Sequence, residues 1–187
     1  MLLYKIKSAI IKWFGDIKIY KYPMFLMLGH VAYKVKGEDV RKILNTLEPG
    51  DVLLRRYNAY LSGLMIPGYF THAAIYVGDN SVVHLLGDGI CKEDILTFTR
   101  CDDLMILRHV DDSVAIKAIK LAWDQLSLNV EYDFDFNTKC SKRFYCTEFI
   151  DFCYGNIVKK NTKRSYIVPD DFINTDLKII YKGIKYV

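Results

Sequence analysis

Residues 71–86 read THAAIYVGDNSVVHLL and contain two histidines, His72 and His84, twelve positions apart. The pattern predicts one strand over residues 73–77, a tight turn at the Gly-Asp-Asn that follows, and a returning strand over residues 81–86. Because side chains alternate along each strand and the turn fixes the register, both imidazoles are expected on one face of the hairpin, within hydrogen-bonding range. The stretch therefore predicts an antiparallel hairpin that pairs a base with a residue that orients it.

A cysteine further along the chain complements this pair. Cys146 follows two aromatic residues and opens a segment, residues 147–154, whose apolar positions recur with helical spacing. The sulfur is therefore expected at a helix N-terminus, where free backbone N–H groups and the helix dipole favour the thiolate and lower the pKa below its usual value of about 8.5. The same N–H groups can form an oxyanion hole. The sequence thus predicts a cysteine nucleophile.

Three segments resemble those of a known superfamily: residues 48–54 (EPGDVLL), 72–78 (HAAIYVG) and 145–149 (YCTEF). The chain resembles the NlpC-type papain-like hydrolases in their circularly permuted branch, which includes the YiiX-like hydrolases and the lecithin retinol acyltransferases. The histidine precedes the cysteine, which is the permuted order. The resemblance covers residues 48–171, and residues 55–62 are also similar to the YiiX-like subgroup.

The resemblance implies roles and a fold. Cys146 would be the nucleophile, His72 the general base and His84 the third polar residue, for which the hairpin geometry is the stronger argument because this position varies in the family. Members cleave or transfer acyl groups through a thioester. The resemblance therefore implies a cysteine-dependent hydrolase or acyltransferase with an α+β, papain-like fold, in which helices pack on a central antiparallel sheet or barrel.

The substrate is less defined than the chemistry. The connection before the hairpin is unusually apolar for a loop, and we expect Leu61 and Phe70 from it, with Tyr57 and Tyr145, to contact the substrate. The alternative is that this segment covers the core. Small-molecule, peptide and lipid-like acyl substrates all fit the resemblance. We favour an apolar acyl group, and a peptidoglycan-type peptide amidase is the alternative.

Metal binding competes with the catalytic interpretation, because two imidazoles and one thiolate could supply three corners of a tetrahedral zinc site. No fourth ligand has convincing spacing. Asp133 and Asp135 hint at cation binding but lack the glycine and downstream glutamate of a calcium loop. We therefore expect no metal and no cofactor. A ligand-binding module without catalysis is a further alternative.

The five cysteines include no Cys-x-x-Cys pair, so a disulfide scaffold is not expected. Cys91, Cys101 and Cys153 are expected to be small buried hydrophobic residues. Cys140 is close enough to Cys146 in sequence for a regulatory disulfide, which is the less favoured alternative. Chemistry is therefore assigned to Cys146.

The chain has 187 residues, of which 51% are hydrophobic and 26% charged, and its net charge is +4. This length and composition suit one compact domain and exclude a disordered chain. With 26 basic and 22 acidic residues, the charge is too balanced to indicate nucleic-acid binding.

Residues 1–47 are expected to form an N-terminal amphipathic helix and a lead-in segment, and residues 48–187 the catalytic domain. The helix, over residues 2–14, carries an apolar stripe beside three lysines. It either packs on the domain, which we favour, or makes peripheral contact with a membrane. The pattern fits neither a cleavable signal peptide nor a transmembrane helix. A cytoplasmic location is the default, with peripheral membrane contact as the alternative.

The remaining elements follow from periodicity and capping residues. They are helices over residues 37–47 (with Asp39 as the cap), 92–98 and 114–125, strands over residues 51–56, 104–109 and 177–181, and a turn at 169–171.

Overall fold

The computed structural model describes residues 6, 17–19, 26–28, 33–58, 66–134, 136, 143–160 and 164–183. The chain forms two compact units, Met1–Ala32 and Tyr33–Val187. In the first unit, strand β1 (Ile17–Ile19) pairs antiparallel with β2 (Leu26–Leu28). The helix expected over residues 2–14 lies outside the described residues, apart from Ile6, which is helical and exposed.

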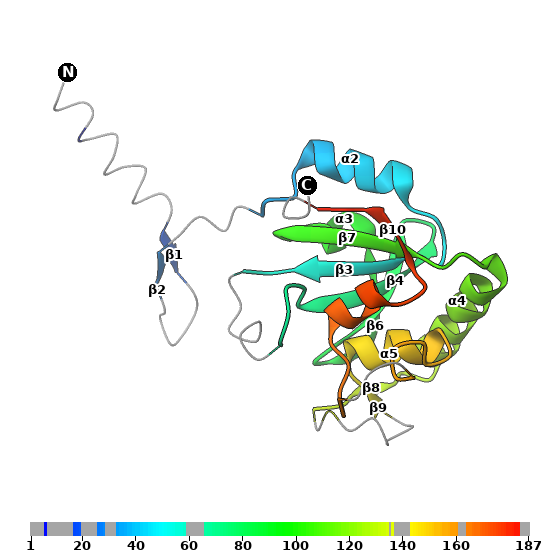
Figure 1. Ribbon diagram of the computed structural model, residues 1–187. Coiled ribbons are helices and arrows are strands. Elements are labelled where there is room, and N and C mark those ends of the chain that lie inside the picture. Colours follow the sequence, from blue (N-terminus) through cyan, green and yellow to red (C-terminus); the bar gives the residue numbers. More distant parts are fainter. Residues whose placement is uncertain are drawn as a thin grey trace. The chain divides into compact units, whose positions relative to one another are not determined.

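The second unit is built on an open six-stranded sheet in the order β10-β7-β3-β4-β5-β6 (Figure 1). Every neighbouring pair is antiparallel. The strands are β3 (Val52–Arg56), β4 (His72–Gly78), β5 (Ser81–Leu86), β6 (Gly89–Asp94), β7 (Asp103–Arg108) and β10 (Lys178–Tyr181). Since β10 and β6 form its two edges, the sheet is not closed into a barrel, and of the two arrangements expected the antiparallel sheet is the one present.

Helices cover both faces of this sheet (Figure 1). Helices α4 (Asp112–Ser127) and α5 (Cys146–Cys153) pack on one face, and α2 (Gly37–Thr46) and the short α3 (Ile95–Phe98) lie on the other. The alternation of strand side chains divides the core accordingly: Val52 and Leu54 face α5, whereas Leu53 packs with Ile43 and Phe98. A short parallel pair, β8 (Glu131–Tyr132) and β9 (Arg143–Phe144), leads to α5, and the 3-10 helix η2 (Pro169–Asn174) leads to β10.

The predicted hairpin is confirmed. Asp79 and Asn80 have φ values of 48° and 51°, which is the left-handed conformation that tight hairpin turns require at both central positions. The register pairs Ile75 with Val83 and Tyr76 with Val82. The pairing of β4 with β5 ends at Ile75 and Val83. The first residues of β4, beginning with His72, therefore lie beyond the paired part of the hairpin.

The EPGD segment fixes the start of β3. Gly50 has a φ of 93°, and a Cβ at this position would lie 2.6 Å from the Cβ of Ala115 in α4, so only glycine fits here. The fully buried carboxylate of Asp51 accepts hydrogen bonds from Arg108 Nε (2.7 Å), Arg108 Nη2 (2.8 Å) and the Glu48 N–H (2.8 Å). The segment therefore connects β3 to β7 and α4.

Several elements differ from the sequence predictions. Residues 92–94 continue β6 instead of starting a helix, and α3 begins only at Ile95, where the Asp94 side chain accepts the Leu96 N–H (2.8 Å). Asp39 is not the N-cap of α2; Lys36 is, and Asp39 accepts its N–H from the first turn (3.1 Å). The turn expected at Pro169 is the start of η2. In the described part of the chain, no helix is long and apolar enough to cross a membrane.

Candidate active site

The hairpin brings the two predicted imidazoles together. His72 Nε2 lies 2.8 Å from His84 Nδ1, and the ring centroids are 5.1 Å apart in an edge-to-face arrangement. His84 is fully buried on β5, while His72 at the start of β4 is partly exposed. Since His84 uses Nδ1 for this contact and His72 uses Nε2, the His72 Nδ1 is left for a different partner.

Cys146 occupies the predicted helix start. It is the first residue of α5, directly after the N-cap Tyr145, and it is 7% exposed. The N–H of Ala73 donates a hydrogen bond to its thiol, as does the N–H of Thr147. Ala73 follows His72 in β4, so this contact places the sulfur against the strand that carries His72.

The expected thiolate is not supported, however. Burial raises the pKa of the Cys146 thiol, and this effect exceeds the opposite influence of the Ala73 and Thr147 N–H groups and of the Arg55 charge. The sequence argument considered the helix N-terminus but not the depth at which the packed helix places the sulfur. At neutral pH the thiol is therefore protonated in the free protein.

The imidazoles are neutral as well. Burial, followed by the positive charge of Arg55, lowers the pKa of His84 from 6.5 to about 3. The same two causes, with a further contribution from His84, hold the pKa of His72 well below 6.5. The thiol and both imidazoles are thus neutral at neutral pH, so the thiol must lose its proton before the sulfur can attack.

Beyond the histidines lies a group of residues that the sequence argument did not identify. The buried guanidinium of Arg55, from β3, stacks over the rings of Phe98 (4.0 Å) and Tyr57 (4.9 Å). Its Nη1 lies 3.2 Å from Glu93 Oε2. The same Glu93 oxygen lies 3.6 Å from His84 Nε2, and Cys91 Sγ lies 3.3 Å from that nitrogen.

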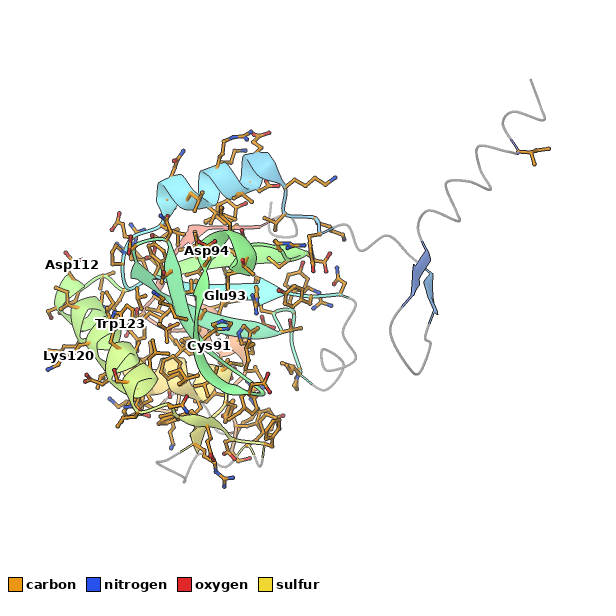
Figure 2. The ribbon with its side chains drawn as sticks, turned by 180° about the vertical axis from the view of Figure 1, so that it is seen from behind. Cys91, Glu93, Asp94, Asp112, Lys120 and Trp123 are labelled. Carbon is orange, nitrogen blue, oxygen red and sulfur yellow. The ribbon has the colours of Figure 1, made fainter. Side chains whose placement is uncertain are left out.

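Cys91 and Glu93 are two residues apart on β6 (Figure 2). Side chains at positions i and i+2 of a strand lie on one face, and Cys91 is the register partner of His84. An alternating pattern over residues 89–94 could have revealed this pair, but the predicted helix over residues 92–98 concealed it. Cys91 is also only partly buried, which corrects the expectation that it is an inert core residue.

The four residues expected to bind substrate are distributed differently. Tyr57 is partly exposed beside Arg55. Phe70 is fully buried in the core, and Tyr145 is 2% exposed, with its hydroxyl accepting the Ile167 N–H (2.8 Å). Both side chains therefore belong to the packed interior. For Phe70, this agrees with the alternative that the segment before His72 covers the core. Leu61 lies outside the described residues.

A group of exposed apolar side chains lies near the nucleophile helix instead. Phe134 is 67% exposed, Phe136 49% and Leu86 38%; we call these three residues the aromatic patch. The Phe136 ring centroid is 5.4 Å from that of Tyr145, the residue before Cys146. A Cβ on Gly87, next to Leu86, would lie 3.6 Å from the Phe134 ring. Contiguous exposed apolar surface commonly marks a binding site, whereas single exposed apolar residues are ordinary.

The arrangement does not suit a metal ion. Among the described residues, no three His, Cys, Asp or Glu side chains are placed to hold one together. The two imidazoles direct Nε2 and Nδ1 at each other, whereas shared ligation requires that their lone pairs converge on one point. The donor set therefore does not fit the zinc alternative.

A cysteine at the start of a buried helix, packed on an antiparallel sheet that carries an imidazole pair, is typical of papain-like thiol hydrolases. Residues 46–186 match the family described as "Permuted papain-like amidase enzyme, YaeF/YiiX, C92 family". The chain belongs to this family, and membership supports a cysteine hydrolase of the amidase type.

Among solved structures, the fold is similar to one titled "Crystal structure of metalloprotein yiiX from Escherichia coli O157:H7, DUF1105". The TM-score is 0.59 at 15% sequence identity, over 73% of this chain and 98% of that one. A search of curated proteins found no match. None of these matches extends to the lecithin retinol acyltransferases.

Proposed function

We propose that this protein hydrolyses an amide through a thioester, with Cys146 as nucleophile, His72 as general base and His84 as the residue that orients the base. The observation that carries the proposal is the sulfur's position. The Ala73 N–H binds it, on the strand that begins with His72, and His72 Nε2 is engaged by His84 at 2.8 Å. This is the nucleophile, base and orienting group of a cysteine hydrolase.

The neutral resting state defines the first step. His72 Nδ1 accepts the thiol proton as the sulfur attacks the carbonyl carbon, which leaves a tetrahedral oxyanion and an imidazolium. His72 then gives that proton to the leaving amine as the C–N bond breaks, and an acyl thioester on Cys146 remains. Water, deprotonated by the same imidazole, attacks the thioester; the C–S bond then breaks to release the acid, and the imidazolium returns its proton to the Cys146 sulfur.

The helix N-terminus supplies the oxyanion site. The first backbone N–H groups of a helix have no partner within it, and that of Cys146 is the first in α5. We assign the developing negative charge to this N–H. The Ala73 N–H, which binds the sulfur in the free protein, remains beside it.

For the substrate, we propose an apolar acyl group. The support is the aromatic patch of Leu86, Phe134 and Phe136, which reaches the nucleophile through the contact of Phe136 with Tyr145. An acyl chain lying on it would gain about 0.8 kcal/mol for each buried methylene, or roughly fourfold in affinity. A polar peptide would gain nothing comparable.

A covalent-intermediate assay tests the nucleophile. The protein is incubated with the p-nitrophenyl ester of decanoic acid, quenched in acid, digested and analysed by mass spectrometry. We expect one acyl group on the peptide that contains Cys146, and none in Cys146→Ala. Cys153→Ala is the matched control, because it removes a buried cysteine from the other end of the same helix. Acylation at another cysteine, or undiminished turnover by Cys146→Ala, would rule out the assignment.

A chain-length series tests the substrate class. With acyl p-nitroanilides from acetyl to dodecanoyl, kcat/KM is expected to rise about fourfold per added methylene until the surface is filled. Phe136→Ser should flatten this dependence while leaving the acetyl compound nearly unaffected. A flat series in the wild type, together with efficient cleavage of short polar peptides, would instead favour the peptidoglycan-type amidase.

A further inference from the structure

We propose that Glu93 is a positioning residue that fixes the tautomers of both active-site histidines, and that Arg55 holds it in place for this task. The inference rests on the proposed function, because it explains how His72 is kept ready to accept a proton. It concerns residues outside the nucleophile, base and orienting group. It depends on a run of contacts from His72 on β4 through His84 on β5 to Glu93 on β6, which Arg55 on β3 also contacts.

The hydrogen bond between the histidines couples their tautomers. At a separation of 2.8 Å, two neutral imidazoles share one proton between His72 Nε2 and His84 Nδ1. For His72 to accept a proton at Nδ1, its own proton must be on Nε2 and point at His84. His84 Nδ1 then acts as the acceptor, so His84 must carry its proton on Nε2. The opposite pair of tautomers leaves His72 without a lone pair at Nδ1.

Glu93 distinguishes between these two states. Its Oε2 lies 3.6 Å from Nε2 of the fully buried His84, while the Glu93 side chain itself is 24% exposed. A carboxylate attracts an N–H at this position and repels a nitrogen lone pair. It therefore favours the proton on His84 Nε2, which is the tautomer that makes His72 a base.

Arg55 determines where this carboxylate points. Its Nη1 binds the same oxygen, Glu93 Oε2, at 3.2 Å, and also lies 3.4 Å from the Phe98 carbonyl oxygen. The stacking of the guanidinium on Phe98 and Tyr57 restrains it further. Arg55 alone would disfavour the imidazolium that forms when His72 takes the thiol proton. The negative charge of Glu93 acts in the opposite direction.

Cys91 is the competing neighbour. Its sulfur lies 3.3 Å from His84 Nε2, and burial together with Glu93 raises the pKa of this thiol. As a thiol, Cys91 could donate to Nε2 and thereby favour the inactive tautomer. A thiol is a much weaker hydrogen-bonding group than a carboxylate, so Glu93 is expected to prevail.

The test reads the tautomers directly. Protein labelled with ¹⁵N at histidine, of which the chain has four, is examined at neutral pH by long-range ¹H–¹⁵N correlation, which separates protonated from unprotonated ring nitrogens. Resonances are assigned with His72→Gln and His84→Gln. In the wild type we expect protons on Nε2 of both His72 and His84. A proton on His84 Nδ1 would overturn the proposal without the need for any Glu93 variant.

Glu93→Gln should then shift both histidines towards the opposite tautomers, since a neutral amide no longer excludes the lone pair. With the p-nitroanilide substrate, kcat is expected to fall about tenfold or more while KM changes less than about twofold, as for loss of an orienting group. Glu93→Asp keeps the charge and should retain part of the effect. Glu131→Gln, an exposed change of the same type on β8, is the matched control.

The outcomes separate this proposal from the proposed function. Unchanged tautomers in Glu93→Gln, with acylation of Cys146 intact, would refute the role of Glu93 alone. Tautomers that follow Glu93 in a protein that never acylates Cys146 would support the coupling and refute the hydrolase. Equal losses of kcat in Glu93→Gln and Glu131→Gln would indicate a general effect of charge and overturn the positioning role.

Discussion

Replacing His84 with glutamine is expected to remove much of the acid sensitivity of the fold. His84 is fully buried, and its pKa is lowered to about 3 by burial and by Arg55. In the unfolded chain the same group titrates near 6.5. Between these values the unfolded state binds a proton that the folded state rejects, so the free energy of unfolding falls as the pH falls below 6.5.

The size of the effect follows from the two pKa values. A group that is protonated only when unfolded contributes a slope of about 1.4 kcal/mol per pH unit. From pH 7 to pH 4.5, His84 alone should therefore lower the stability of the wild type by about 2.5 kcal/mol. His72 acts in the same direction, because its pKa is also lowered. Glutamine does not titrate, so this contribution is absent from His84→Gln.

The measurement is urea unfolding, followed by circular dichroism, at both pH values. The quantity compared is the change in unfolding free energy between the two, which cancels any loss that the substitution causes at every pH. His109→Gln, which removes a histidine outside the site, is the matched control. If His84→Gln loses as much stability on acidification as the wild type does, His84 is not held neutral and the argument for a neutral resting site fails.

Two further predictions concern buried carboxylates. Asp51→Ala should lower the free energy of unfolding, measured with urea, by about 3 kcal/mol or more, because it leaves Arg108 and the Glu48 N–H without their buried acceptor. Asp51→Asn still offers an oxygen to that N–H and should cost less. Equal losses in the two variants would contradict this explanation. Burial, followed by the charge of Asp133, raises the pKa of Glu148 from 4.5 to about 7, so the stability that protonated Glu148 contributes is lost as the pH rises through this interval. Glu148→Gln should therefore be more stable than the wild type at pH 8 but not at pH 5. The same difference in unfolding free energy at both pH values would refute the raised pKa.

Local sequence signals account for the features of the site that were predicted correctly. Gly78-Asp79-Asn80 specifies the turn, and the turn determines which residues of β4 and β5 face each other. The helical spacing after Cys146 likewise located the start of α5. In each case, neighbouring residues determine the geometry, so the chain could be interpreted segment by segment.

The features that were missed depend on contacts between distant segments. Residues 92–94 join β6 because they pair with β5, and nothing within the segment itself indicates that pairing. Glu93 meets Arg55 across 38 positions of sequence. The predicted direction of the Cys146 pKa shift was wrong. The helix terminus, which lowers the pKa, is a local feature of the sequence, whereas the burial that outweighs it arises only when α5 packs on the sheet.

The hydrogen bond from the Ala73 N–H to the sulfur has a consequence for mutagenesis. Its donor belongs to the backbone, so an alanine scan cannot detect it, and any small residue that fits this buried position, proline excepted, would conserve it. Side-chain substitution at position 73 can therefore occur without altering the polar surroundings of the nucleophile. Only a change to the main chain itself, such as replacing this amide with an ester by chemical synthesis, would reveal how strongly the sulfur depends on the backbone of β4.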